Sequence, residues 1–494
     1  MKSRIVKHQG PWVIAVVLLA GLVDAKCADS GNGGMSGSRP NVVFFLGDDQ
    51  SRFDHSAYGN PTVPTPTTDA LSKESLVFDK AFTGQAICAP SRSMLYTGLY
   101  PLRNGCFINH TKIRAGVKTL PVYLEELGYN VILAGKSHVG PAAQFSWSKS
   151  FPPVENEGAS RPGIPLDEID GFLADPGTKP FCLLITSEFP HPPYMKSTPY
   201  TADDVTLAPF ISKSERSLKN AAFFYANIVE KEKELAAVLK LLEEHEQKDK
   251  SIVFYADDHG LFRGKFTAYD SGLNVAFMVR WPEKVKAGRS DALVSFADFV
   301  PTMIELAGGN PPQELDGKSL LPILENGGGK IHDYVYGVTV NQGILDRHVF
   351  PQRSVHDGRY HYIHNFNSLE RIKRDESEGK EIHPFLKMGA EKHKDLPEEM
   401  LFDTQSDPHE MNNLAGDPKL TEIKQRLKSE LFRWMREQND YLTESGSVPF
   451  LQVGKRFALD QYDAELNPIP KGLVGCLKGK TINPHDATAP KADR

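Results

Sequence analysis

Continuous apolar runs that end in polar residues recur through the first three hundred residues of the chain. The first run, NVVFFLGDD, covers residues 41–49, and similar runs occupy residues 131–140, 180–193 and 251–260. An apolar run without polar alternation is typical of a strand that is buried on both faces of a parallel sheet. Each of these strands would carry its polar residues at its carboxyl end, where the ligand sites of such sheets lie.

Segments with helical spacing separate these runs. Residues 119–130 (TLPVYLEELGYN) predict a helix that ends at Gly128, and residues 214–246 predict a long helix with one apolar face. Strands that alternate with helices predict an α/β fold, in which helices cover both faces of a large, mostly parallel sheet. We expect this catalytic domain in residues 40–309.

The pattern changes after about Gly309. Shorter runs at residues 330–340, 352–366 and 400–410 predict antiparallel strands with tight turns, and residues 419–438 predict an amphipathic helix. We therefore expect a smaller α+β subdomain with an antiparallel sheet in residues 310–443. The tail, residues 444–494, shows few signals.

The first 25 residues have the pattern of a secretory signal peptide. Lys2, Arg4 and Lys7 precede an apolar run, Trp12–Val23, and small residues suited to cleavage end at Ala25. Residues 26–39 are rich in Gly and Ser and predict a flexible leader. We expect an exported protein without a membrane span, periplasmic or secreted, or lysosomal or extracellular if the source is a eukaryote.

Composition excludes two classes of protein. The 494 residues carry a formal charge of -6, and removing residues 1–25, which hold three basic residues and one acidic residue, gives -8. A general nucleic-acid binder would carry a basic excess instead. Five cysteines in a chain of this length do not make a disulfide scaffold.

The stretch CAPSRSMLYTG, residues 88–98, places a cysteine just before a predicted helix. Pro90 suits the first turn of that helix and Gly98 suits its end. The free amides at a helix N-terminus favour an anion, so Cys88 is either a buried structural residue or a nucleophile aimed at an anionic substrate. Polar residues after the strands are expected at the same edge of the sheet: Asp48, Asp49, Lys136, His138, His191, Asp258 and His259.

The same stretch matches the signature Cys-x-Pro-Ser-Arg-x-x-x-x-Thr-Gly at every fixed position. With LGDDQ, GKSHVG, ADDHG and GKFTAYDSG in the expected order, the chain resembles the type I sulfatases of the alkaline phosphatase superfamily from Arg39 to about Thr443. GKSHVGP, QRSVHDGRYHYIHNFN and DPHEMNNLA are most similar to the heparan N-sulfatase branch and to bacterial polysaccharide sulfatases. The resemblance implies an alkaline phosphatase-like fold and hydrolysis of sulfate esters or N-sulfo groups of a sulfated carbohydrate.

The resemblance also implies the roles of the site residues. Cys88 would be oxidised to formylglycine by a formylglycine-generating or anaerobic sulfatase-maturing enzyme, and its hydrated aldehyde would be the nucleophile. Arg92 would hold this hydrate, while Lys136 and Lys265 would hold the sulfate oxygens or the diol. His138 would take a proton when sulfate leaves, and His191 would protonate the departing sugar oxygen or nitrogen.

One divalent cation is implied as well, bound by Asp48, Asp49, Asp258 and His259 together with residue 88. Three carboxylates favour calcium over zinc, although His259 stands where many family members have Asn, and imidazole is a softer ligand. The metal is therefore better defined by its site than by its identity.

Residues for the carbohydrate are harder to assign. Arg353, His356 and Arg359 either line a groove for an anionic saccharide or belong to a solvated strand face, and the sequence leaves both interpretations open. Asn109-His110-Thr111 is a glycosylation sequon that matters only in a eukaryotic host. Two other functions also stay open: a formylglycine-dependent phosphodiesterase or phosphonate monoester hydrolase, and an unmatured glycan-binding protein. The sugar, the oligomeric state and the cysteine pairing stay undetermined.

Overall fold

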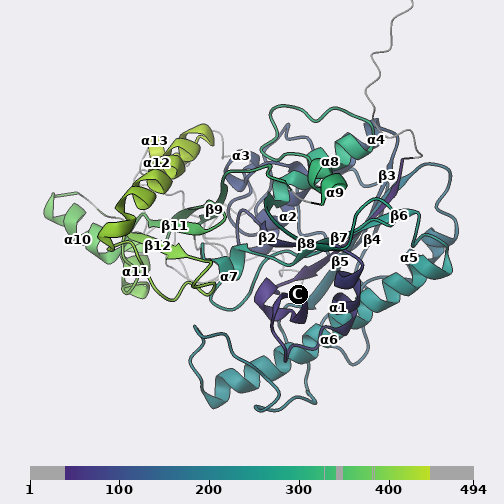
Figure 1. Ribbon diagram of the computed structural model, residues 1–494, viewed down its shortest axis with the longest axis horizontal. Coiled ribbons are helices and arrows are strands. Elements are labelled where there is room, and N and C mark those ends of the chain that lie inside the picture. Colours follow the sequence, from purple (N-terminus) through teal and green to yellow (C-terminus); the bar gives the residue numbers. More distant parts are fainter. Residues whose placement is uncertain (1–38, 328, 341–348, 381, 383, 445–494) are drawn as a thin grey trace, which may run out of the picture. The chain divides into compact units, whose positions relative to one another are not determined.

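The computed structural model describes residues 39–327, 329–340, 349–380, 382 and 384–444 (Figure 1). The expected signal peptide lies outside the described residues, as do the leader up to residue 38 and the tail from residue 445. Among the described residues, no helix has both the length and the apolar composition that a membrane span needs.

The larger sheet has eight strands in the order β4-β3-β5-β1-β6-β7-β2-β8. Only β7 runs antiparallel to its neighbours, which confirms the mixed, mostly parallel sheet that the apolar runs predict. The strands are β1 (Asn41–Asp48), β2 (Leu76–Phe82), β3 (Asn130–Gly135), β4 (Lys149–Phe151), β5 (Phe181–Pro190), β6 (Ser251–Asp257), β7 (Phe277–Arg280) and β8 (Gly288–Ser295).

Helices cover both faces of this sheet because alternate residues of the central strands point in opposite directions (Figure 1). Phe44 meets Phe299 edge-on at 4.8 Å between ring centroids, while Phe45 belongs to a second core with Leu235. One face carries α2 (Cys88–Thr97), α4 (Leu120–Glu126), α8 (Phe299–Leu306) and α9 (Leu321–Asn326), and the other carries α1 (Pro66–Lys73), α5 (Leu166–Ala174) and α6 (Glu215–Glu244). The helices expected at residues 119–130 and 214–246 are thus α4 and α6.

Short helical elements connect the strands and helices of this framework. They are η1 (Arg52–Asp54), η2 (Ser56–Tyr58), α3 (Pro101–Asn104), η3 (Ala142–Gln144), α7 (Asp270–Leu273) and η4 (Phe296–Asp298).

The smaller sheet is antiparallel, in the order β12-β11-β10-β9, as expected for the C-terminal subdomain. Its elements are β9 (Val335–Thr339), β10 (Gln352–His356), β11 (Tyr360–Asn365), α10 (Leu369–Ser377), α11 (Pro384–Lys392), β12 (Glu399–Asp403), η5 (Pro418–Leu420), α12 (Thr421–Glu437) and α13 (Tyr441–Glu444). Trp434 of α12 stacks on Tyr336 at 4.3 Å and meets Tyr100 edge-on at 5.2 Å. This aromatic contact joins the small sheet to the start of α3, so the two sheets belong to one body.

Candidate active site

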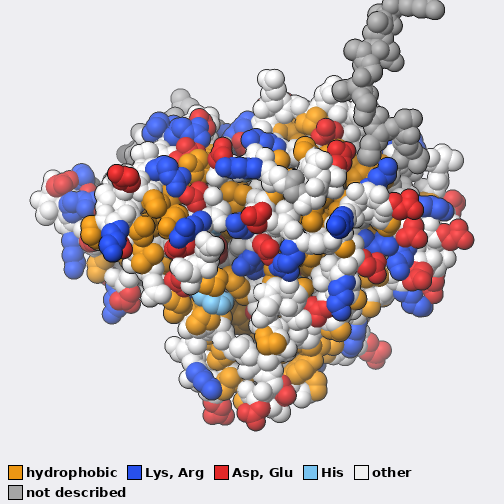
Figure 2. All heavy atoms as spheres, in the orientation of Figure 1, with side chains coloured by type: hydrophobic (Ala, Val, Ile, Leu, Met, Phe, Trp, Pro, Cys, Tyr) orange, Lys and Arg blue, Asp and Glu red, His pale blue; other side chains and the backbone are white. Residues whose placement is uncertain are grey.

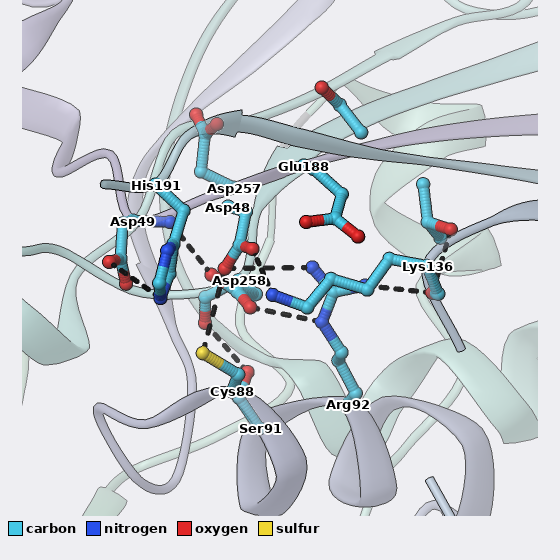
Figure 3. Close-up of polar contacts among 12 residues, drawn as sticks. Asp48, Asp49, Cys88, Ser91, Arg92, Lys136, Glu188, His191, Asp257 and Asp258 are labelled. Carbon is cyan, nitrogen blue, oxygen red and sulfur yellow. Dashed lines mark hydrogen bonds and ion pairs between the residues drawn. The ribbon is translucent and has the colours of Figure 1, made fainter. Parts of the chain in front are cut away.

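The carboxyl ends of four neighbouring parallel strands bring the candidate residues together. In the order β3-β5-β1-β6, the strand ends are followed by Lys136, His191, Asp49 and Asp258. Helix α2 begins against the same edge, and Figure 3 shows its first residue, Cys88, below the carboxylates. The convergence that the sequence predicts is therefore present in the fold.

Cys88 lies at the centre of this group and is only 2% exposed. Its Sγ is 3.5 Å from Oδ1 of Asp48 and 3.3 Å from Nε2 of His259. Burial raises the pKa of the Cys88 thiol well above its usual value, so the unmodified thiol stays protonated and is a poor nucleophile. The helix ends as predicted, with Gly98 in the left-handed conformation at φ 68°.

Four side chains could hold a metal ion. The ligand atoms of Asp48, Asp49, Cys88 and His259 all lie within 4.8 Å of one another, and all four residues are buried. Asp49 has φ 71°, a left-handed backbone that turns its carboxylate toward the group. Carboxylate oxygens beside one imidazole suit a divalent cation, so these residues fit the implied metal.

Asp258, the remaining expected ligand, has other partners here. Its Oδ1 accepts a hydrogen bond from the amide of Asp49 at 3.1 Å, and its Oδ2 lies 3.0 Å from Nε of Arg92. Its Oδ1 is nevertheless 3.7 Å from Nε2 of His259, so it lies beside the four metal-competent residues. Metal coordination by Asp258 stays a prediction.

Three cations balance the charge of the carboxylates. Arg92 is fully buried, Lys136 donates from Nζ to Asp48, and Lys265 donates to both oxygens of Asp49 at 2.9 and 2.8 Å. Burial by itself would raise the pKa of Asp48, but Lys136 and other nearby cations hold it well below its usual value. The two lysines therefore pair with carboxylates whose oxygens lie within 4.8 Å of the Cys88 sulfur.

The two candidate histidines occupy different surroundings. His191 is partly open to solvent, with 25% of its side chain exposed, and its Nε2 is 3.6 Å from Oδ2 of Asp49. His138 follows β3, and its Nε2 lies 2.8 Å from Nδ1 of His110. Burial lowers the pKa of both His138 and His191, which favours neutral rings that can accept a proton.

The structure corrects two of the three expected carbohydrate contacts. Arg353 is fully buried and pairs with Asp440, so it offers no surface to a saccharide. His356 is 3% exposed and packs against Phe82 at 5.0 Å between ring centroids. Both residues lie on β10, which is buried along its whole length, whereas Arg359 keeps 54% of its side chain exposed beside Asp403.

Sequence reasoning missed several buried contacts between distant parts of the chain. Asp257 is bound by Lys231 at 2.6 Å and by His55 at 2.8 Å. A second group of three residues with ligand atoms within 4.8 Å, Asp270, His361 and Glu410, links α7 to the small sheet. No local motif predicts these two groups of contacts, because the residues in each group are far apart in sequence.

The sequon asparagine is also buried. Asn109 is 2% exposed, and its Oδ1 accepts a hydrogen bond from the amide of Ala89 at 3.3 Å. In the folded protein this side chain is not accessible for glycosylation.

Comparison with known proteins identifies the family. Residues 40–309 match the family described as "Sulfatase", and residues 257–383 match "N-sulphoglucosamine sulphohydrolase, C-terminal". The chain is a member of the sulfatase family. Family membership makes it a sulfuric ester hydrolase, and it implies a metal ion and a formylglycine modification.

Two relatives span most of the sulfatase chain. An "Ulvan-active sulfatase" of Formosa agariphila is 42% identical over 446 residues, which is 89% of each chain. The human "N-sulphoglucosamine sulphohydrolase" is 27% identical over 476 residues, covering 82% of this chain and 92% of its own. The second relative belongs to the branch that the sequence motifs resemble.

Solved structures share the fold at low identity. One structure, bound to its substrate D-glucosamine-2-N,6-O-disulfate, has a TM-score of 0.63 at 19% identity and covers 82% of this chain and 99% of its own. A phosphonate monoester hydrolase of Agrobacterium radiobacter has a TM-score of 0.64 at 19% identity, covering 81% and 96%. The fold alone therefore does not distinguish sulfur from phosphorus substrates, whereas the family assignment does.

Proposed function

We propose that this sulfatase removes sulfate from a sulfated polysaccharide, through a formylglycine made from Cys88. The observation that carries the proposal is the position of Cys88, whose Sγ lies within 3.5 Å of both Asp48 and His259. The ulvan-active and N-sulphoglucosamine relatives support a saccharide substrate. The bond that is cleaved is that of a sulfate ester or of an N-sulfo group.

The first half of the reaction transfers the sulfo group to residue 88. One hydroxyl of the hydrated aldehyde loses its proton to solvent and attacks sulfur, and the bond between sulfur and the sugar oxygen or nitrogen breaks with its electrons on the sugar atom. His191, the more accessible histidine, would donate a proton to the departing atom from its protonated form, which the nearby carboxylates of Asp48 and Asp49 favour. Lys136 and Lys265 hold the sulfate oxygens as point charges.

The second half releases sulfate. His138 takes the proton of the remaining hydroxyl, the aldehyde re-forms, and the bond to the sulfate oxygen breaks. Arg92, already held by Asp258, keeps the hydrate oriented. Asp48, Asp49, Asp258 and His259 would hold a calcium ion, which would supply positive charge that lowers the pKa of the diol and balances the sulfate oxygens.

We expect the polysaccharide to bind at one limited region of the surface. Figure 2 shows a hollow on one face with histidine and apolar side chains at its rim, while acidic and basic side chains are interspersed over the same face. Remote sugar contacts would add binding energy in the transition state, so small aryl sulfates should be poor substrates. We also propose export from the cytoplasm, with maturation by a formylglycine-generating or anaerobic sulfatase-maturing enzyme.

Two measurements test the function. Mass spectrometry of the peptide around Cys88 should detect formylglycine, and a retained thiol would favour a glycan-binding protein without catalysis. Catalytic efficiency should then be highest on ulvan oligosaccharides, sulfated glycosaminoglycan disaccharides or N-sulfated glucosamine. Higher efficiency on an aryl phosphodiester or a phosphonate monoester would contradict the sulfatase proposal, and an aryl sulfate as best substrate would contradict its carbohydrate part.

A further inference from the structure

The ring of His138 is paired with a second histidine that lies outside the sulfatase motifs. Nε2 of His138 and Nδ1 of His110 are 2.8 Å apart, and the ring centroids are 4.6 Å apart. Exactly one proton can occupy that contact, so one ring donates and the other accepts. The pairing therefore links the tautomer of His138 to that of His110.

The chain holds this pair in place through unusual backbone conformations. His110 has φ 61° and His138 has φ 51°, and left-handed residues other than glycine cluster at functional sites. The loop of His110 is tied at both ends. The amide of Ala89 donates to Asn109, beside Cys88, and the amide of Ile113 donates to the carbonyl of Gly140 at 2.8 Å, just after His138.

The other nitrogen of His138 decides which tautomer is useful. Nδ1 of His138 is buried and has no hydrogen-bond partner among the described residues. If His138 donates from Nε2, Nδ1 keeps a lone pair and can accept a proton. If His110 donates instead, His138 carries its proton on Nδ1 and has no free base.

We propose that His110 is a positioning residue that accepts the Nε2–H of His138 and so keeps Nδ1 of His138 as the base for sulfate release. This inference rests on the proposed function. When Nδ1 takes the proton of the remaining hydroxyl, the O–H electron pair forms the C=O bond, and the C–O bond to sulfate breaks with its electrons on the leaving sulfate. Water then adds to the aldehyde and restores the diol.

Neighbouring charges explain why His138 needs this acceptor. Burial and the charge of Lys136 both lower the pKa of His138, as do nearby His110 when it is charged and Arg92, while Asp48 acts in the opposite direction. A protonated His138 is therefore costly in this position. A neutral His110 that accepts from Nε2 spreads the positive charge when the ring becomes protonated.

Loss of the His110 side chain should therefore slow only the second half of the reaction, the release of sulfate. His110→Ala should lower kcat by about 10- to 100-fold, the range for losing a partner that orients a functional histidine. KM should fall in proportion and kcat/KM should stay near the wild-type value, because it reports only steps up to departure of the alcohol. An aryl sulfate should then give a burst of phenol, and quenched samples should contain sulfated residue 88 by mass spectrometry.

The conservative variant separates positioning from simple packing. In His110→Asn the amide oxygen replaces Nδ1 as acceptor, and Asn tolerates a positive φ, so this variant should release sulfate at close to the wild-type rate. As a readout without turnover, ¹⁵N NMR of Cys88→Ala protein should show His138 protonated on Nε2, and His110→Ala should remove this preference. Thermal melts of both variants report whether they fold.

The outcomes distinguish this inference from the function on which it rests. A burst in His110→Ala with recovery in His110→Asn supports the inference. Equal losses in kcat and kcat/KM, no burst, or a His138 protonated on Nδ1 would each overturn it while leaving a functional wild-type sulfatase. A matured wild-type protein without sulfatase turnover would contradict the proposed function itself, and the NMR result would still judge the tautomer.

Discussion

Arg353 and Asp440 form a fully buried, two-pronged ion pair, with Nε to Oδ2 at 2.6 Å and Nη2 to Oδ1 at 3.1 Å. The pair joins β10 to the segment between α12 and α13, and the Arg353 guanidinium also lies 5.3 Å from the ring centroid of Tyr441. An arginine that the sequence offered as a carbohydrate ligand thus has a structural role. Its geometry leads to the first prediction.

Arg353→Ala should destabilise the protein by about 3–5 kcal/mol, because it leaves the Asp440 carboxylate buried without a partner. Urea denaturation measures the loss. The double variant Arg353→Met/Asp440→Leu should recover much of this stability, since no charge then stays buried alone. A loss below about 1 kcal/mol, the usual value for an exposed ion pair, would show that the pair is open to water.

Arg359 should behave in the opposite way. Its side chain is half exposed beside Asp403, so Arg359→Ala should change stability by less than about 1 kcal/mol. If it contacts the saccharide, kcat/KM on a sulfated oligosaccharide should fall by about 5- to 10-fold, equivalent to roughly 1 kcal/mol. The matched control is Arg433→Ala, another half-exposed arginine that pairs with Glu430 on α12. Equal effects of the two changes would remove Arg359 from the substrate site.

Cys88→Ala should abolish turnover while the fold stays intact, because no nucleophile is left. Cys88→Ser should be almost as inactive, since an ordinary hydroxyl can accept the sulfo group but cannot expel sulfate by re-forming an aldehyde. Steady-state assays on an aryl sulfate and an oligosaccharide measure both. The control Cys182→Ala removes another fully buried thiol, in β5, and should lower stability without abolishing turnover. Near-normal activity of Cys88→Ser would refute the formylglycine mechanism.

Removal of the metal should abolish activity and leave the fold in place. Dialysis against a chelator should lower kcat by more than about 100-fold, because the cation carries charge stabilisation worth several kcal/mol. Added calcium should restore turnover better than zinc, given the carboxylate-rich site. Circular dichroism of the stripped protein checks the fold, and normal turnover after complete removal would show that Asp48, Asp49, Asp258 and His259 do not hold a metal that catalysis needs.

Stability should depend on pH through Glu234 of α6. Burial raises the pKa of Glu234 to about 7, although Ser187 and Ile164 donate hydrogen bonds that act against the shift. Between about pH 4.5 and 7, Glu234 is therefore protonated in the folded state and ionised in the unfolded state. The contribution of Glu234 to the free energy of unfolding is therefore complete below about pH 4.5. It decreases as pH rises through about 7, by about 3 kcal/mol in total.

Glu234→Gln should remove this dependence, because its neutral amide does not titrate: the amide oxygen can accept from the N–H of Ile164 while the amide NH2 donates to Oγ of Ser187. The difference in unfolding free energy between wild type and variant should therefore shift in favour of the variant as pH increases. Urea denaturation at several pH values across the window measures that difference. A difference that stays constant with pH would contradict a protonated Glu234 in the folded state.

The sequence by itself determined the parts of this protein that depend on local pattern. Apolar runs such as residues 41–46 predict buried strands, because apolar side chains on both faces of a strand have to be covered by other parts of the protein. The carboxyl ends of parallel strands lie at the same edge of the sheet, where polar residues can form a site. The motif around Cys88 predicts the family, and the polar strand ends predict Asp48 and Asp49 in its site.

Only the tertiary structure decided which charged residues have buried partners. Arg353 and Arg359 belong to the same short stretch, yet packing against Asp440 buries the first while the β10–β11 turn exposes the second. His110 meets His138 because two loops fold against the start of α2. Burial and pairing depend on residues far away in the chain, and no local periodicity records them.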